Sequence, residues 1–140
     1  MKMRVILLFL SVTCSCLSPA FGVQPLGGEV NEQVRSIILE VETASRQFAA
    51  LDEFGKKTVD QGKAILSIGP AAVYELSARL DNPDWKVRFW IIDILGYLEN
   101  NDAKNILIKV SVDRKEYGRI REQARRSLKL IDSPLERNIR

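Results

Sequence analysis

A pattern of residues recurs after 33 positions in the second half of this 140-residue chain. The dipeptide Val87-Arg88 returns as Ile120-Arg121, and a match at an offset of 31 joins residues 72–76 to 103–107. Self-similarity of this length is typical of chains that stack one helical unit on the next. An eroded third copy lies upstream, at residues 57–68. The inward positions matched between the two clear copies are Ile91 and Ala124, Ile94 and Ser127, Leu95 and Leu128, and Leu98 and Ile131.

The spacing of apolar residues within each copy predicts helices. In residues 87–98 the apolar positions follow i, i+3, i+4, i+7, i+8 and i+11, which is one face of an α-helix. Only Arg88 and Asp93 are polar in this segment, so we expect it to be enclosed by neighbours on nearly all sides. Residues 120–131 keep the inward face but are charged elsewhere, as the last unit of a stack requires. No five-residue segment alternates with the period of a strand, so we expect no sheet.

Residues 29–51 predict one long helix ahead of the repeats. Their apolar positions are separated by alternating steps of four and three, which is the seam of a heptad pattern. We expect this helix to lie along the first repeat and cap the stack. The alternative is a coiled coil that joins two copies of the chain through the same seam. The seam residues are Val30, Val34, Ile37, Val41, Ala44, Phe48 and Leu51.

Three short segments predict breaks between helices. Gly69-Pro70 ends one helix and opens the next, with proline at a position where the missing N–H costs nothing. Asp84 follows the turn at Asn82-Pro83 and is expected to cap the helix after it. Asn100 is expected to cap the next helix in the same way.

Two stretches carry the repeat, IGPAAVYELSARLDNPDWKVRFWIIDILGYLE and AKNILIKVSVDRKEYGRIREQARRSLKLI. In each, an Asp and a turn precede a Val-Arg or Ile-Arg pair that opens a helix. This pattern resembles the short HEAT repeats that were first named for their likeness to phycobilisome lyase subunits. The resemblance covers about residues 57–131. It implies an all-α fold, a short α-solenoid of about three HEAT-like helical hairpins behind a long N-terminal capping helix, and a surface held in front of another macromolecule.

The resemblance also implies a structural role for a set of charged residues at the turns. In short HEAT repeats the equivalent Arg and Asp form a ladder between adjacent repeats through charge-assisted hydrogen bonds. The ladder residues here are Asp81, Asp84, Arg88, Asp113 and Arg121.

Composition excludes several kinds of chemistry. The chain has no His and two Cys, which rules out imidazole acid-base catalysis, a Ser-His-Asp triad and a Cys/His zinc site. Nothing in the sequence brings two of the repeat carboxylates to the separation that glycoside hydrolysis needs. We therefore expect no enzymatic activity, no cofactor and no metal site.

Residues 1–22 predict export through a signal peptide. A basic start with Lys2 and Arg4 precedes a short apolar run, and Ala20-Phe21-Gly22 has the small residues of a cleavage site. Cleavage after Ala20 instead, retention as an anchor, and lipid attachment at one of the two cysteines remain alternatives. Both cysteines, Cys14 and Cys16, lie in the segment that cleavage removes, so the mature chain suits an oxidising periplasmic or secreted location.

These patterns define the expected organisation of the chain. The predicted parts are a signal peptide at 1–22, a flexible lead-in at 23–28, one α-helical domain at 29–132 and a frayed tail at 133–140. Within the domain, residues 29–51 are the capping helix and residues 57–131 the repeats.

Charge is distributed unevenly along the chain. Residues 23–113 hold 10 basic and 14 acidic side chains, whereas residues 114–140 hold 9 and 4. This basic end predicts either a solubilising surface or a docking patch for an acidic protein, an anionic membrane or a polysaccharide. No nucleic-acid partner is expected, because the signal peptide takes the chain away from it. The cations on the last helix are Arg121, Arg125, Arg126 and Lys129.

Trp85 and Tyr117 occupy matching turns in the two clear copies. They are candidates for aromatic anchors that bind a partner, or else they pack over the turns. The sequence as a whole predicts an exported, non-enzymatic protein-interaction module. Two alternatives remain: binding of an anionic surface through the basic end, and service as an accessory subunit of an envelope enzyme.

Overall fold

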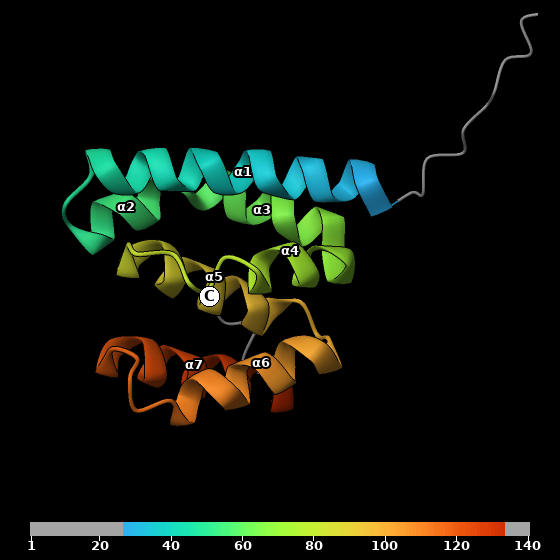
Figure 1. The fold of residues 1–140 in the computed structure, drawn as a ribbon, viewed down its shortest axis with the longest axis vertical. Helices are drawn as coiled ribbons and strands as arrows, with labels where there is room; N and C mark the ends of the chain where they lie inside the picture. Colours follow the sequence, from blue (N-terminus) through green and yellow to red (C-terminus); the bar gives the residue numbers. More distant parts are fainter. Residues whose placement is uncertain (1–26, 134–140) are drawn as a thin grey trace, which may run out of the picture.

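The computed structural model describes residues 27–133, which form helices and connecting turns without any strand (Figure 1). The predicted signal peptide, the lead-in up to residue 26 and the tail from residue 134 lie outside the described residues. The elements are α1 (Gly27–Gln47), α2 (Leu51–Lys57), α3 (Val59–Ile68), the 3₁₀ turn η1 (Gly69–Ala72), α4 (Val73–Ser77), α5 (Trp85–Tyr97), α6 (Asn101–Val112) and α7 (Gly118–Asp132).

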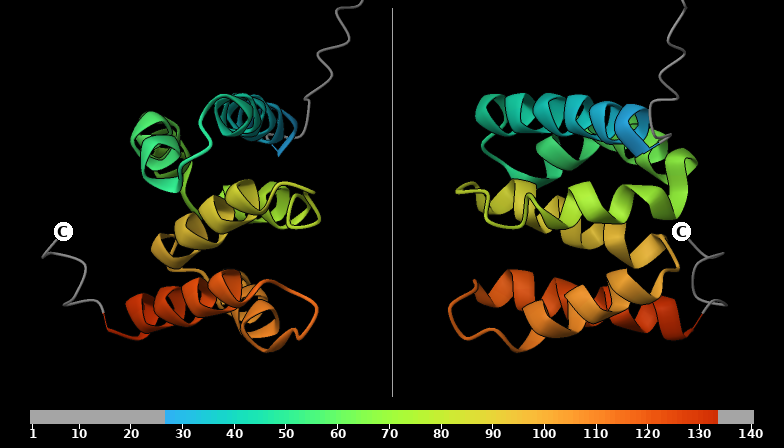
Figure 2. Two further views of the ribbon diagram at one scale, coloured as in Figure 1. Left: turned by 90° about the vertical axis from the view of Figure 1, so that its left-hand side faces the viewer. Right: turned by 45° about the vertical axis from the view of Figure 1, so that its right-hand side comes forward.

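The helices are arranged in tiers along the longest axis of the molecule. Figure 1 shows α1 lying over α2 and α3, then α4 with α5, then α6 with α7. Turned by 90°, the same tiers form two layers, with α3, α5 and α7 on one side and α1, α4 and α6 on the other (Figure 2). The closest packing is that of α7 against α5 and α6.

Helix α5 is the centre of the core, as its sequence predicts. Val87, Ile91 and Leu95 are fully buried, and so is Ile92 on a different face of the same helix. Burial on opposite faces is possible because α5 contacts α1, α3 and α4 on one side and α6 and α7 on the other.

Most matched positions of the repeat are buried together, but Leu128 and Ile131 on α7 are only half-buried, whereas their counterparts Leu95 and Leu98 are buried. Ile120 and Ala124 on α7 are as fully buried as their counterparts on α5. The residues matched at an offset of 31 are also fully buried. These are Ala72 and Leu76 in the first copy, and Ala103 and Leu107 in the second. The repeated spacing therefore marks core positions in successive tiers.

Gly96 allows α5 and α7 to approach closely. A Cβ placed on this glycine would lie 2.7 Å from the Cβ of Ser127, closer than side chains pack. Ser127 is fully buried, and its hydroxyl donates a 2.9 Å hydrogen bond to the carbonyl of Ile92. A small residue on each helix thus brings the two backbones together.

The long N-terminal helix differs from its predicted form. Helix α1 begins two residues before the expected domain start and ends at Gln47, so that Leu51 opens α2 instead of closing α1. Its buried stripe is Val34, Ile38, Val41 and Ser45, with Ile37 only half-buried. A straight helix has 3.6 residues per turn, so its buried face drifts away from a heptad seam that repeats every 3.5 residues.

Lys86 holds the end of α1. Its side chain is buried, and the ammonium donates hydrogen bonds to the carbonyls of Ser45 and Phe48, at 2.7 Å in the second case. The carbonyl of Ser45 lies in the last turn of α1 and that of Phe48 directly follows the helix, where helical partners are missing. A cation in this position stabilises the helix end and attaches it to α5.

The predicted breaks and caps are confirmed. Gly69 has a φ of 77°, a conformation that favours glycine, and Pro70 follows in the first turn of η1. Asp84 accepts a hydrogen bond from the backbone N–H of Lys86 at the start of α5. Asn100 accepts bonds from the N–H groups of Asp102 and Ala103 at the start of α6.

Candidate functional site

Arg88 joins adjacent tiers, but its partner is not an Asp. The guanidinium forms two parallel hydrogen bonds, of 2.9 and 3.0 Å, with the carboxylate of Glu116 in the turn between α6 and α7. It also donates to the carbonyl of Asn82 in its own turn. Sequence reasoning missed Glu116, because nothing in the residue pattern distinguishes it from an exposed turn residue.

The other predicted ladder residues act within their own turns or at a helix start. Asp113 accepts a 2.9 Å bond from the N–H of Lys115, and Arg121 donates to the carbonyl of Glu116. Asp84 caps α5 and also accepts a 2.7 Å bond from the hydroxyl of Ser45 on α1. Asp81 is exposed. Within residues 27–133 none of these Asp residues forms an ion pair with either arginine, so the expected Asp–Arg ladder is wrong in its partners.

The two aromatic candidates differ in exposure. Trp85 is half-buried against the core, packs edge-on against Phe89 at 6.5 Å, and is covered by the guanidinium of Arg119. Trp85 is therefore partly covered by other side chains. Tyr117 is 64% exposed, and the guanidinium of Arg88 lies 5.9 Å from its ring centre.

The basic face of α7 is partly used inside the chain. Arg125 and Arg126 share the carboxylate of Glu122, at 3.1 and 3.6 Å, and Arg125 also donates to the carbonyl of Ser111. The guanidinium of Arg121 donates to the carbonyl of Glu116 in the turn before α7. Arg125, Arg126 and Lys129 remain exposed.

A buried ion pair joins α1 to α4. Glu75 is almost fully buried and forms two 2.9 Å hydrogen bonds with the guanidinium of Arg35, which is half exposed. These bonds to Arg35 hold the pKa of the Glu75 carboxyl below its usual range, against the opposing effect of burial. The pair fixes the first tier on the second and leaves Glu75 ionised.

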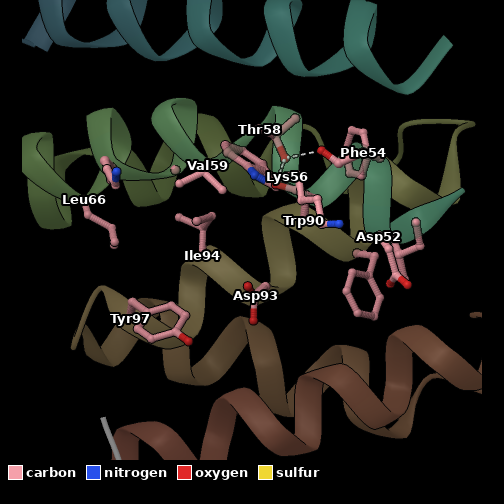
Figure 3. A pocket seen from close by; sticks show the side chains of 15 residues that line it. Asp52, Phe54, Lys56, Thr58, Val59, Leu66, Trp90, Asp93, Ile94 and Tyr97 are labelled. Atoms are coloured by element: carbon pink, nitrogen blue, oxygen red, sulfur yellow. Dashed lines mark hydrogen bonds between the residues drawn. The ribbon is translucent and has the colours of Figure 1, made fainter. Parts of the chain in front are cut away.

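One hollow in the described part of the chain is a groove between α2 and α3 on one side and α5 on the other. Its volume is about 660 Å³. In Figure 3, Val59 and Leu66 reach toward it from α3, and Ile94 lies opposite them on α5. Val59 and Leu66 are 48% and 38% exposed and lie seven positions apart on one face of α3.

Two of the residues that line this groove are glycines, which have no side chain to fill it. Gly55 and Gly62 both line it, and a Cβ at Gly55 would meet nothing within 4 Å. At Gly62 the methyl group of Ile94 already comes to within 3.1 Å of the place where a Cβ would lie. The sequence contains one signal for this surface, which is the pair of apolar residues on α3 outside the inward stripe.

A second hollow continues the groove toward α7. It has a volume of about 240 Å³ and shares Leu51 and Phe89 with the first. Its far wall carries Arg119 and Arg126, together with Glu122. The apolar groove therefore leads into the basic face of the last helix.

Comparisons of the chain with protein-family models, with curated proteins and with solved structures found no match. No helix within residues 27–133 has both the length and the apolar character needed to cross a membrane. The same residues hold no group of three or more His, Cys, Asp or Glu side chains arranged to bind a metal ion. The features that bear on function are thus the groove and the basic face beside it.

Proposed function

We propose that this chain is an exported, non-enzymatic protein-interaction module built as a short α-solenoid of HEAT type. In the proposed solenoid α1 is the long capping helix, and the helical units behind it are α2 with α3, α4 with α5, and α6 with α7. The paired burial of Val87 with Ile120, and of Leu76 with Leu107, supports this assignment, because equivalent positions meet the core in successive units.

The groove is the observation that carries the function. It combines a floor of buried core residues, among them Trp90 and Ile94, with exposed apolar residues at its edge. A site with an apolar centre and charged margins is typical of protein-protein contacts. Its edge residues Val59 and Leu66 keep 48% and 38% of their surface exposed, and contact with a partner would bury that apolar surface.

Export is supported by residues outside the described part. The basic start, apolar run and small-residue cleavage site of residues 1–22 match a signal peptide. Residues 27–133 contain no Cys, which suits an oxidising compartment. The mass of the N-terminal peptide of the protein recovered from its native cells, together with cell fractionation, tests this part of the proposal; an intact Met1 on protein that fractionates with the cytoplasm contradicts it.

The interaction role is tested by site-specific photo-cross-linking in cells that express the full chain. A photoreactive phenylalanine analogue replaces one exposed residue at a time, at Leu66, Tyr74, Val112 and Tyr117, which sample four parts of the surface. The proposal expects a discrete adduct with a second protein at Leu66. Absence of any protein adduct at all four positions refutes the interaction role.

A second candidate function rests on the exposed cations of α7. Arg125, Arg126 and Lys129 could hold an anionic membrane or polysaccharide. Flotation with vesicles that contain acidic lipid decides this candidate. Binding that survives Arg126→Glu and Lys129→Glu together eliminates it.

A further inference from the structure

We infer that the groove binds an amphipathic helix of a partner protein, whose apolar face lies between α3 and α5 and whose acidic end meets Arg119 and Arg126. This inference rests on the proposed function and specifies the chemistry of the partner. It goes beyond that function, because it names the site, the conformation and the charge of the bound segment.

The apolar part of the partner is indicated by the groove itself. Val59 and Leu66 project from α3 at positions i and i+7, so they form the two ends of a row two turns long, with Gly62 and Lys63 between them. Ile94 faces this row from α5, and the ring of Tyr97 lies at the same end as Leu66 (Figure 3). A row of apolar side chains on the partner would cover both walls at once.

A helix suits this groove better than an extended peptide. The walls are helices whose backbone N–H and C=O groups are bonded within each helix, so they offer no edge for a strand. An extended partner would therefore bury its own polar backbone without hydrogen bonds, whereas a helix satisfies them internally. Helix α3 has 10 residues, and at about 1.5 Å per residue it gives the groove a length of about three helical turns.

The acidic end of the partner is indicated by the charges around the second hollow. Glu122, the carboxylate on that wall, is already shared by Arg125 and Arg126. Arg119 lies over the ring of Trp85, and within the described part of the chain no carboxylate pairs with it. Helix α7 as a whole carries five basic and two acidic side chains. Cations in excess of local carboxylates favour an acidic partner over a basic one.

The carboxylates along the groove do not reverse this balance. Asp93 accepts a 2.7 Å hydrogen bond from Gln123 on α7, and Asp52 lies near the start of α2. Lys56 and Lys63 line the same groove, so the charges along its length are matched in number. The excess of positive charge is confined to the α7 end, and it gives the bound helix a direction as well as a location.

A display library of random 16-residue peptides, selected on the full chain, tests the inference. The library is counter-selected on the Val59→Glu/Leu66→Glu variant, whose altered residues are exposed and whose helix content is checked by circular dichroism. The expected selection enriches peptides with apolar residues at i, i+3 or i+4, and i+7, and with Asp or Glu gathered at one end. No enrichment over the counter-selected variant, or enrichment of extended or basic sequences, overturns the inference.

The enriched peptide is then measured by fluorescence anisotropy against matched variants. Arg119→Glu/Arg126→Glu is expected to weaken binding about tenfold, since two ion pairs are exchanged for repulsions. Arg114→Glu/Lys115→Glu reverses the same number of charges outside the two hollows, and Ile108→Glu/Val112→Glu alters exposed apolar residues on α6. Both controls are expected to bind within about twofold of wild type. Equal losses in the controls and in the site variants refute the assigned location.

Other occupants give different results. Light scattering that shows a dimer for the wild type and a monomer for Val59→Glu/Leu66→Glu assigns the groove to a second copy and overturns the inference. Binding to acidic vesicles that depends on the same two residues assigns it to a membrane and also overturns it. If peptide selection fails but cells still yield a protein adduct at Tyr74, Val112 or Tyr117, the interaction role stands and this site is wrong. If both fail, the proposed function falls as well.

Discussion

Alanine substitution at two glycines is expected to change the stability of this chain in opposite directions. Gly55 and Gly96 both lie inside helices, where alanine is more favourable than glycine by about 1 kcal/mol. At Gly55 a Cβ would meet nothing within 4 Å, so most of this gain is expected to appear as an increase of about 0.5–1 kcal/mol in the free energy of unfolding.

At Gly96 the gain is outweighed by a steric clash. A Cβ there would lie 2.7 Å from the Cβ of Ser127 and 2.9 Å from its Cα, whereas ordinary contacts begin at 3.4 Å. Helices α5 and α7 would have to separate by several tenths of an ångström, and overpacking of this kind costs about 1–3 kcal/mol. The shift also strains the hydrogen bond from Ser127 to the carbonyl of Ile92, worth about 1 kcal/mol. The net expectation for Gly96→Ala is a loss of about 1–3 kcal/mol.

Urea unfolding followed by circular dichroism measures both changes. In a domain of this size 1 kcal/mol shifts the melting temperature by about 4–8 °C, so thermal melts give an independent check. The two variants carry the same chemical change and differ only in their surroundings, and each serves as the control for the other. If Gly96→Ala is as stable as the wild type or more stable, the close approach of α5 and α7 is wrong.

Three further predictions concern the polar contacts between tiers. Lys86→Met is expected to lower the free energy of unfolding by about 2–4 kcal/mol in urea titrations, since two carbonyls at the end of α1 lose a charged donor; a change below about 0.5 kcal/mol would show that water replaces it. Glu75→Gln tests the depressed pKa of the Glu75 carboxyl. The ionised carboxylate stabilises the fold above about pH 5, and this stabilisation is lost as the pH falls through the folded-state pKa. The difference in the free energy of unfolding between wild type and variant should therefore narrow from pH 7 to pH 3. A gap that stays constant with pH contradicts the role of Arg35. A double-mutant cycle with Arg88→Met and Glu116→Gln is expected to give a coupling energy of about 1–3 kcal/mol, because the pair is mostly buried and forms two parallel bonds; additive effects would mean that the pair contributes nothing.

Local patterns in the sequence were sufficient to predict the central helix α5 and the caps at the starts of α5 and α6, although they misplaced the ends of α1. The spacing of Val87, Ile91 and Leu95 identifies the buried face of α5, and the structure buries all three completely. The caps at Asp84 and Asn100 were equally readable, since a capping side chain bonds to backbone groups two or three residues away. Capping contacts form between residues that are close together in the sequence, so the sequence alone is enough to predict them.

Contacts between tiers could not be read in this way. The heptad spacing of the first helix favoured Ile37, yet Ile38 is the buried residue, because the packing of α1 on α3 and α4 selects the face of a straight helix. The arginine ladder was expected to use Asp, and the carboxylate that reaches Arg88 is that of Glu116. The rotation and separation of two helices decide which side chain reaches from one to the other. A sequence repeat predicts neither the rotation nor the separation.

The groove is a further feature that depends on contacts between helices and not on local sequence. The chain alone determined that residues 59–68 form a helix with an inward stripe, and it contained the outward pair Val59 and Leu66 without indicating any surface opposite them. Only the tertiary structure decided how α3 packs against α5, with Gly62 close to Ile94 and a groove along the contact, and only it placed Arg119 on the wall of the adjoining hollow. The physical reason is that helix formation follows from interactions over one or two turns, whereas a hollow is the space left when helices distant in sequence have packed.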